Sequence, residues 1–405
     1  MKNILSVSMC LPYQGVPHAG GKTVNYYLGR FAQEENINVK VVCKIRNNEK
    51  NIERKKINDN FEVYTVSMPD GNLKKVMIYL TNIWSKVNPI NKYGNTLIKY
   101  IYSQYLKTLK SLKKTGYKPD VIILEWTEMV LFINEIKSIF PDAYIIASEH
   151  DVKFQSECRK YLAEKNKIKK LYKKIKYMSM KKKEICALNL ANLIVTQSNK
   201  DKKILENNGI EASRQIVISP YYMSAKEIWR GQGKEGIAVY GDMSRPENYE
   251  SAIWFIENVF KKIENKDIKL YVIGANPVEK LNKYNSNKII ITGFVENVFE
   301  YLNNCFCMVA PLQIGAGIKV KCVEAISYGI PLIANDIAVE GIAIEDRKDY
   351  LHCTSCDEFL SSIHELYGNI ELQYSLSINA RNFSKKNLNM EDSYREYYHK
   401  IREVL

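Results

Sequence analysis

Short apolar runs, rich in β-branched residues, recur along the chain and alternate with stretches of helical periodicity. In the first half of the chain these runs cover residues 3–10, 38–45, 61–68, 120–126, 143–150 and 192–198. A polar stretch follows, and a second series then covers residues 236–242, 269–275, 288–295, 305–312, 331–338 and 349–354. Near-continuous apolar strands that alternate with helices are typical of parallel sheets covered on both faces. The pattern predicts an α/β protein with two doubly wound, Rossmann-like domains.

The length of the chain agrees with two domains, because 405 residues are more than one hydrophobic core usually serves. We place the N-terminal domain at residues 1–220 and the C-terminal domain at 221–389. The last helix, 390–405, has no strand after it and can pack on either domain, the first included. Ligands of doubly wound sheets bind beyond the carboxyl ends of the strands, so a cleft between the two domains is the expected site.

The charge and the cysteine content of the chain bear on its class of partner and on its cellular compartment. The formal net charge of +14 points to an anionic partner, although a genome rich in Lys, Asn and Ile codons explains it equally well. The nine cysteines are irregularly placed, and the pair Cys353 and Cys356 lacks the further ligands of a zinc site. The N-terminal apolar run is too short for a signal peptide, and no run reaches the ~18 apolar residues of a membrane span. We expect a reduced, cytoplasmic chain.

One turn in the second domain carries candidate chemistry. The strand that ends at Leu312 is followed by Gly315, Ala316 and Gly317, and a helix is predicted to begin near Ile318. Glycine lets a ligand approach the backbone closely. The first N–H groups of the helix lack partners within the helix and, together with its dipole, favour an anion.

Charged residues follow on this predicted helix. Lys319 and Val320 lie in its first turn, where a lysine opposes the helix dipole unless an anion is bound. Glu324 lies two turns after Gly317 on the same face, where it could accept hydrogen bonds from a ribose diol beyond the phosphates. The alternative is a surface ion pair between Lys321 and Glu324.

A second glycine turn follows the first strand of the chain. The sequence HAGGKT, residues 18–23, lacks the P-loop spacing, because the position five residues before Gly21 is Val16. Gly20 and Gly21 still precede a predicted helix at the carboxyl edge of the first sheet. Both an anion site and an ordinary tight turn fit this arrangement.

A basic run covers residues 153–183, where thirteen Lys or Arg and two Glu give a net charge of +11. The apolar residues that recur in it at helical spacing are Ile168, Leu171, Tyr172, Ile175 and Met178, and Ile185 just beyond the run is a further candidate. This pattern predicts one basic amphipathic helix, which can lie on an anionic bilayer. The alternative is a solvated helix that packs its apolar stripe on its own domain. Weak aromatic interleaving argues against a nucleic acid partner.

The second domain resembles the donor-binding half of a large family of retaining glycosyltransferases with the GT-B fold, the glycosyl transferases group 1 family. Within the glycosyltransferases, the resemblance is to family 4. The stretches that carry the resemblance there are GDMSRPEN (241–248), TGFVENVFEYL (292–302), APLQIGAGIKVKCVEAISYGIPLIA (310–334) and AVEGI (338–342). The first domain matches more loosely, at Gly20 and Gly21, SEHDV (148–152) and residues 184–201. The resemblance implies a GT-B fold, with two Rossmann-like domains facing a cleft.

The resemblance also implies roles for particular residues. The helix after the glycine-rich turn would receive the donor diphosphate, and Glu324 would bind the ribose. Gly293, Phe294 and Val295 would lie along the base, and the turn at Gly20 and Gly21 would face the phosphates. His150 would sit beside the transferred sugar. From its position alone, at the end of a strand, His150 is more often a local hydrogen-bonding residue than a catalyst.

Several positions depart from the family pattern. Ala316 replaces a glutamate that contacts the donor sugar in the family, and Asp242 and Glu247 replace its phosphate-binding Arg and Lys. Arg245 is the nearest basic residue, and Lys319 would carry the charge instead. The asparagine often found before the linker is missing from SPYY, residues 219–222.

We therefore expect a retaining, metal-independent glycosyltransferase without a cofactor, because the dense Asp/Glu cluster of a magnesium-dependent transferase is absent. It would transfer a sugar from a nucleotide diphosphate sugar to a saccharide or lipid-linked saccharide, in the synthesis of cell-surface polysaccharide or glycan. It would act in the cytoplasm, with peripheral attachment to the inner membrane face as a further expectation. Two alternatives remain: an inactive GT-B partner subunit that stabilises a true transferase, and a sugar-nucleotide epimerase of the same fold.

Overall fold

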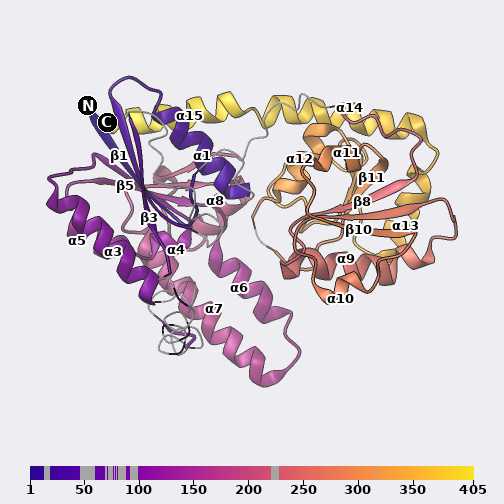
Figure 1. Cartoon of the computed structure of the whole chain (residues 1–405), viewed down its shortest axis with the longest axis horizontal. Helices are drawn as coiled ribbons and strands as arrows, with labels where there is room; N and C mark the ends of the chain where they lie inside the picture. The colour runs from indigo at the N-terminus through magenta and orange to yellow at the C-terminus, as the bar shows by residue number, and fades with distance from the viewer. Residues whose placement is uncertain are drawn as a thin grey trace. The chain divides into compact units, whose positions relative to one another are not determined.

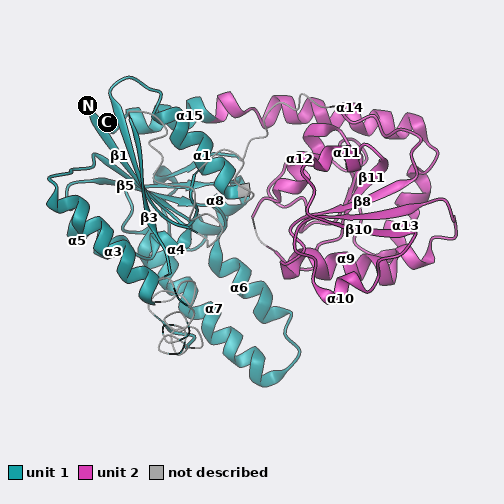
Figure 2. Cartoon of the chain, in the orientation of Figure 1, with its two compact units in different colours: residues 1–219, 394–405 teal, residues 220–393 magenta. Residues whose placement is uncertain are grey.

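The computed structural model describes residues 1–12, 19–45, 60–68, 71, 76, 78, 80, 88–91, 99–219, 228–315 and 317–405. They divide into two compact units: Met1–Ser219 with Tyr394–Leu405, called unit 1, and Pro220–Ser393, called unit 2 (Figure 2). Each unit contains one parallel sheet flanked by helices (Figure 1). The predicted α/β class with two parallel-sheet domains is confirmed.

The sheet of unit 1 has seven strands in the order β3-β2-β1-β4-β5-β6-β7, and every described pairing is parallel. Its strands are β1 Lys2–Ser8, β2 Ile37–Lys44, β3 Phe61–Val66, β4 Val121–Glu125, β5 Tyr144–Glu149, β6 Leu193–Thr196 and β7 Gln215–Val217. Its helices are α1 Ala19–Phe31, α3 Lys99–Lys114, α4 Thr127–Val130, α5 Ile133–Ile139, α6 Lys153–Leu162, α7 Lys167–Leu188 and α8 Asn199–Glu206.

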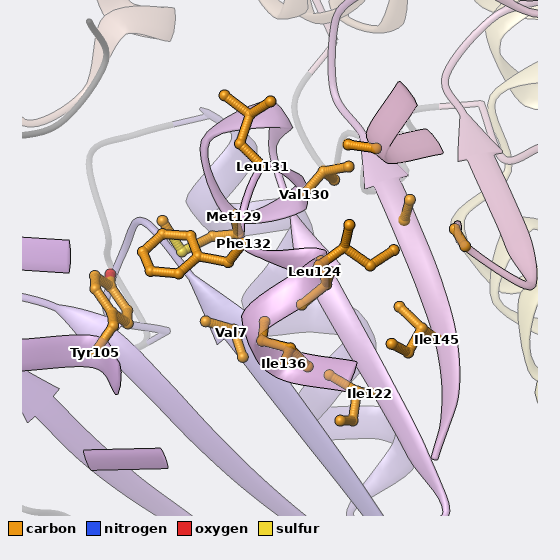
Figure 3. Close-up of a cluster of buried hydrophobic side chains, with 14 of the residues drawn as sticks. Val7, Tyr105, Ile122, Leu124, Met129, Val130, Leu131, Phe132, Ile136 and Ile145 are labelled. Carbon is orange, nitrogen blue, oxygen red and sulfur yellow. The ribbon is translucent and has the colours of Figure 1, made fainter. Parts of the chain in front are cut away.

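The apolar faces of these elements form the core of unit 1 (Figure 3). Val7 and Leu124 from neighbouring strands are fully buried under the side chains of α3 and α5. The rings of Tyr105 and Phe132 meet edge to face at 5.9 Å, and the Tyr105 hydroxyl donates to the Ser8 carbonyl at 2.6 Å. The buried hydroxyl is thus satisfied, which fixes α3 against the carboxyl end of β1.

The last helix, α15 Met390–Arg402, packs on α1 of unit 1 through aromatic rings. The Tyr397 ring meets those of Tyr27 and Phe31 edge to face, at 5.3 Å and 5.4 Å. The Arg30 guanidinium lies 4.1 Å from the centre of the Tyr394 ring. These contacts bury Tyr397 and hold the C-terminal segment in unit 1.

The sheet of unit 2 has six strands in the order β10-β9-β8-β11-β12-β13, again with parallel pairings. Its strands are β8 Gly236–Tyr240, β9 Lys269–Ile273, β10 Ile289–Gly293, β11 Cys305–Ala310, β12 Leu332–Ala334 and β13 Leu351–His352. Its helices are α9 Pro246–Asn258, α10 Glu279–Asn282, α11 Val298–Leu302, α12 Val320–Tyr328, α13 Cys356–Leu366 and α14 Ile370–Asn387.

Glycine allows the loops at the carboxyl edge of this sheet to approach one another. Gly241 follows β8 and Gly274 follows β9. A Cβ added to Gly274 would lie 1.7 Å from the carbonyl oxygen of Gly241, so no side chain fits there. The Gly274 N–H also donates to the Gly293 carbonyl at the end of β10. The close approach brings the loops after three strands to one edge, where a ligand of such a sheet binds.

Two parts of the chain differ from the sequence expectations. Each of the twelve predicted strands is present, but the three-residue edge strand β7 was missed, because so short a run carries no clear periodicity. The basic run 153–183 forms two helices, α6 and α7, where one was expected, and Asn166 caps the second through its side chain. None of the described helices is both long and apolar enough to cross a bilayer.

Candidate functional site

Helix α12 begins two residues later than the sequence predicted. Its first helical residue is Val320, and Lys319 occupies the N-cap position with an extended backbone. The Lys319 ammonium donates to the carbonyl of Gly317 and lies 3.7 Å from Oε2 of Glu340, which is buried. Lys319 therefore ties the glycine-rich turn to Glu340 at the N-terminus of α12, and its side chain is 11% exposed.

Lys321, in the first turn of α12, joins this helix to α9. Its Nζ donates to Oδ1 of Asn248 at 2.8 Å. Burial lowers the pKa of Lys321 to about 8, because the charged form is poorly solvated there. Asn248 in turn donates to the carbonyl of Asp242 at 2.8 Å. A cation is thus held between the N-termini of two helices, a place that favours an anionic ligand.

A further basic residue near this edge is Arg245, at the N-cap of α9. Its side chain is largely exposed and forms an ion pair with Glu247. Ser244 donates its backbone N–H and its hydroxyl to Oδ1 of Asp242, at 3.0 Å and 2.7 Å. The two acidic residues that replace family basic residues therefore have partners of their own within this loop.

Glu324 lies inside α12, with 8% of the residue exposed. The hydroxyl of Tyr240, at the end of β8, donates to the Glu324 carboxylate, and burial together with this carboxylate raises the Tyr240 pKa. The alternative of a surface ion pair between Lys321 and Glu324 is wrong, since Lys321 bonds to Asn248 and Glu324 is a buried partner of Tyr240. Tyr240 therefore fixes the orientation of the carboxylate.

The segment at the end of β10, residues 293–295, contains three residues that differ in backbone conformation and in exposure to solvent. Gly293 adopts a left-handed backbone, with φ of 69°. Phe294 is 72% exposed, whereas Val295 packs against the core of unit 2. Of this segment, the Phe294 ring is the part available to stack on a planar ligand such as a base.

The glycine-rich turn before α12 has Gly317 in the left-handed region, with φ of 68°, and Gly315 with φ of 145°. A Cβ on Gly315 would lie 3.0 Å from Cε of Lys319, so glycine leaves room for the lysine stem. Ile318 packs against the core of unit 2. The predicted position Ala316 lies outside the described residues, as do 220–222 of the SPYY stretch.

In unit 1, Gly20 and Gly21 lie inside the first turn of α1, which begins at Ala19. The predicted turn ahead of a helix is therefore wrong, because neither glycine adopts a left-handed backbone and both continue the helix.

His150 follows β5 and lies among side chains from the carboxyl ends of β4 and β6. Its Nε2 lies 2.9 Å from Oε2 of Glu125, the last residue of β4, and its Nδ1 lies 2.9 Å from the amide nitrogen of Gln197, directly after β6. This pairing fits a neutral imidazole whose Nε2–H donates to the carboxylate and whose Nδ1 accepts from the amide. Both ring nitrogens are thus engaged within unit 1, and the side chain is 9% exposed.

Trp126 covers the face of this histidine. Its ring stacks on that of His150 at 4.2 Å with an interplanar angle of 14°. The Trp126 backbone has φ of 70° and ψ of 151°, a conformation that residues with a side chain rarely adopt. Such backbone strain is concentrated at functional sites, and here it places an aromatic ring beside the one candidate catalytic residue of unit 1.

A buried carboxyl pair lies next to His150 in the chain. Glu149 and Glu184 both contact the Thr127 hydroxyl, at 2.6 Å and 3.4 Å. The Glu184 carboxylate also accepts the backbone N–H groups of Lys153 and Phe154, both at 2.8 Å, at the start of α6. Burial raises the pKa of Glu184 to about 8 and that of Glu149 well above its usual value. The Thr127 hydroxyl donates to Oε2 of Glu149, whereas Oε1 of Glu149 is buried without a hydrogen-bond partner, which favours the uncharged form of this carboxyl.

Sequence reasoning missed several of these residues. Lys321 was named only as the partner of Glu324 in an alternative surface ion pair, and its partner Asn248 and the Glu324 partner Tyr240 were not singled out. Trp126 and Gln197, around His150, were missed as well. Asn248 does lie within the matched stretch 241–248, but its partner is 73 residues away, and no local spacing reports such a contact. Within the described part of the chain, no cluster of three or more His, Cys, Asp or Glu could hold a metal ion.

One segment of unit 2 matches a known protein family. Residues 234–369 match the family model described as "Glycosyl transferases group 1". This segment contains Lys319, Lys321 and Glu324, and it extends from the start of the unit 2 sheet to the loop before α14. A search of curated protein sequences finds no match.

Solved structures resemble the whole chain at low sequence identity. Sucrose-phosphate synthase from Thermosynechococcus elongatus has a TM-score of 0.75 at 12% identity, covering 100% of this chain and 99% of that one. HepE of Anabaena, in complex with UDP and glucose, has a TM-score of 0.69 at 10% sequence identity, and the match covers 100% of both chains. The lipopolysaccharide outer core galactosyltransferase WaaB has a TM-score of 0.61 at 14% sequence identity, and the match again covers 100% of both chains. The chain thus has the GT-B fold, and its residues 234–369 match the model of the glycosyl transferases group 1 family.

Proposed function

We propose that this chain is a glycosyltransferase that transfers a sugar from a nucleotide diphosphate sugar to a saccharide or lipid-linked saccharide. The observation that carries the proposal is the Lys321–Asn248 contact, which holds a cation between the N-termini of α12 and α9. This position lies within the matched group 1 domain. Structures of the similar HepE contain UDP and UDP-glucose, which supports a nucleotide sugar as donor.

Each group at this edge has a proposed task. Lys321, Lys319 and the first N–H groups of α12 bind the diphosphate, which leaves with the negative charge that develops during transfer. Glu324, oriented by Tyr240, accepts hydrogen bonds from the ribose diol. The exposed ring of Phe294 stacks on the base, and Gly293 leaves room beside it.

We further propose that the transfer retains the configuration of the donor sugar and needs no metal. The leaving diphosphate would take the acceptor proton on the same face of the sugar, so no pair of catalytic carboxylates is required. His150 is the proposed contact to the transferred sugar in unit 1, with its ring held by Glu125, Gln197 and Trp126. The acceptor belongs to the synthesis of a cell-surface polysaccharide or glycan, on the cytoplasmic side of the membrane.

The test begins with nucleotide binding. Titration calorimetry with uridine, guanosine and adenosine diphosphates should find one nucleotide that binds the wild type and binds Lys321→Met at least tenfold more weakly. Lys262→Met removes an exposed lysine of unit 2 and is the matched control, which should bind like the wild type. Equal affinity of Lys321→Met and wild type for every nucleotide would refute the diphosphate site.

Turnover separates the proposed function from its two alternatives. A transferase releases nucleoside diphosphate faster when a saccharide acceptor is present, and a chelator leaves the rate unchanged. Nuclear magnetic resonance of the product reports whether the anomeric configuration is retained. Binding without turnover, with activity restored by a partner chain, would identify an inactive subunit. Conversion of one nucleotide sugar into another without acceptor would identify an epimerase.

A further inference from the structure

The two helices of the basic run form a hairpin that extends away from the sheet of unit 1 (Figure 2). Helix α7 contacts α6 mainly through charged and aromatic side chains. Nζ of Lys173 lies 2.6 Å from the Glu164 carboxylate, and Nζ of Lys176 lies 2.9 Å from the Glu157 carboxylate. The Tyr177 ring lies parallel to that of Tyr161, with centres 6.4 Å apart. The face of α7 that meets α6 is therefore polar and aromatic.

The apolar face of α7 is exposed to solvent. Its residues recur at the spacing of one helical face, and the exposed fractions are 82% for Ile168, 60% for Leu171, 38% for Tyr172, 41% for Ile175 and 58% for Met178. We call these five residues the α7 stripe. Together with Leu162 on α6, they account for six of the sixteen exposed large hydrophobic residues in the part of the chain that is described. The expectation that the stripe packs on its own domain is wrong for residues 168–178.

Near the sheet, the apolar residues of α7 are buried, in contrast to the α7 stripe. Met180, Ala187 and Leu188, further along α7, are buried in the core of unit 1. The helix therefore changes from a buried apolar face near the sheet to an exposed one towards the tip. A contiguous exposed apolar surface on a soluble chain indicates an interaction surface.

Lysines border the stripe. Lys167 and Lys174 lie on one side of it along the helix and Lys169 lies on the other, by the 100° step between successive helical residues. All three are exposed, unlike Lys173 and Lys176, which are half-buried against α6. Long lysine side chains can lay their methylene stems along an apolar layer while the ammonium groups reach anionic headgroups.

We propose that the α7 stripe inserts into the interfacial layer of an anionic lipid bilayer and that the bordering lysines bind its headgroups. Two features favour a bilayer over a protein partner. The exposed stripe lies on a hairpin that extends away from the sheet, and lysines border it on both sides, as in helices that lie in the plane of an anionic membrane. The run 153–183 also supplies a net charge of +11 to attract such a surface. The inference is independent of the proposed sugar transfer, because it involves no residue of the nucleotide site.

Vesicle sedimentation tests the apolar part of the proposal. The wild type should bind vesicles of phosphatidylcholine with phosphatidylglycerol at low salt and should not bind pure phosphatidylcholine. The variant Ile168→Ser, Leu171→Ser, Ile175→Ser should lose this binding. The matched control is Ile370→Ser, Tyr374→Ser on α14, where both residues are 56% exposed but have no lysine border. The control should bind like the wild type, and circular dichroism shows that each variant is folded.

The lysines have their own matched variants. Each lysine near an anionic surface strengthens binding about fivefold, so Lys167→Gln, Lys169→Gln, Lys174→Gln should weaken binding about a hundredfold. Lys110→Gln, Lys113→Gln, Lys114→Gln removes three exposed lysines from α3 and should have a much smaller effect. Binding should also fade with salt, since the Debye length falls from about 10 Å at 0.1 M to about 3 Å at 1 M.

Insertion can be observed directly by placing a tryptophan in the stripe. The fluorescence of Tyr172→Trp should be quenched by brominated lipids in anionic vesicles, beyond the quenching of the wild type. A wild type that ignores anionic vesicles at low salt would overturn the proposal. A dimer in solution that the serine variant dissociates would overturn it too, and would assign the stripe to a second copy of the chain. Vesicle binding that persists in the serine variant would refute insertion by the stripe.

Discussion

Nζ of Lys321 lies 2.8 Å from Oδ1 of Asn248, so a hydrogen bond joins the first turns of α12 and α9. Since burial lowers the pKa of Lys321 to about 8, this lysine loses its proton just above neutral pH. The charged form is the one that attracts a diphosphate. We therefore expect the affinity for nucleoside diphosphate to fall as the pH rises above 8, by at most about tenfold per pH unit.

Calorimetric titrations at a series of pH values measure this dependence. Lys321→Met should bind weakly at every pH, without the loss above pH 8. Lys262→Met keeps Lys321 and should reproduce the wild-type profile. A wild-type affinity that stays constant through this range would show that Lys321 does not face the ligand.

The contact of Lys319 with Glu340 gives this lysine two separable roles. Removal of the ammonium removes the cation that faces the buried Glu340 carboxylate, so Lys319→Ala should lower the free energy of unfolding of unit 2 by about 1–3 kcal/mol. If Lys319 also binds the diphosphate, the same variant should lose about 1.5–3 kcal/mol of binding free energy. Urea unfolding and calorimetry measure the two effects.

A double variant separates these roles. Lys319→Met, Glu340→Gln removes both charges and should recover part of the stability lost by Lys319→Ala. The loss of nucleotide affinity should remain. Recovery of both properties together would mean that Lys319 only orders the glycine-rich turn.

The hydrogen bond from Tyr240 to Glu324 predicts a distinct pattern of ligand affinities. Glu324→Ala should weaken the binding of a ribonucleoside diphosphate by about 1.5–3 kcal/mol but leave the affinity for inorganic pyrophosphate nearly unchanged. Tyr240→Phe should have a smaller effect in the same direction, because the carboxylate is present but less firmly oriented. If the variant loses equal affinity for the nucleotide and for pyrophosphate, Glu324 only keeps the loop ordered and does not bind the ribose.

The environment of His150 predicts an effect on turnover without an effect on nucleotide binding. If His150 contacts the transferred sugar, His150→Ala should lower kcat by about 10²–10³-fold. Glu125→Gln and Gln197→Ala, which alter the two partners of the ring, should lower kcat to a smaller extent and leave the affinity for nucleoside diphosphate unchanged. A loss of stability in all three variants with kcat unaffected would make His150 a structural residue.

The carboxyl pair of unit 1 predicts how stability depends on pH. The pKa of Glu184 rises to about 8 and that of Glu149 also rises, so the folded chain binds a proton more tightly than the unfolded chain. The free energy of unfolding should therefore be highest below the ordinary carboxyl pKa and fall as the pH rises towards 8, by at most about 1.4 kcal/mol per pH unit for one proton.

Glu149→Gln is the direct test of this dependence. Glutamine can keep the hydrogen bond to Thr127 without a charge, so the variant should be more stable than the wild type near pH 8 and should lose less stability as the pH rises, because only the buried Glu184 then remains to be ionised. Chemical unfolding at several pH values measures both. A variant that is less stable than the wild type at pH 8 would contradict the raised pKa values.

The pattern of apolar residues alone determined the fold class. Continuous runs such as 120–126 and 305–312 are buried on both faces of a sheet, and only parallel sheets with helices on both sides bury strands in this way. Residues close in the chain, such as Gly315, Gly317 and Glu324, also placed the candidate site at the start of α12. Local spacing reports these features because strand and helix periods are local properties.

Tertiary structure decided which partner each charged residue has. Lys319 and Lys321 are two residues apart, yet one faces Glu340 and the other faces Asn248 on another helix. Helix geometry turns successive side chains to different neighbours, and those neighbours come from distant parts of the chain. The same holds for the α7 stripe. The helical spacing of its apolar residues could be recognised in the sequence, but whether these side chains pack on the protein or meet solvent depends on where α6 lies. Periodicity defines a face, and only the packed structure decides what covers it.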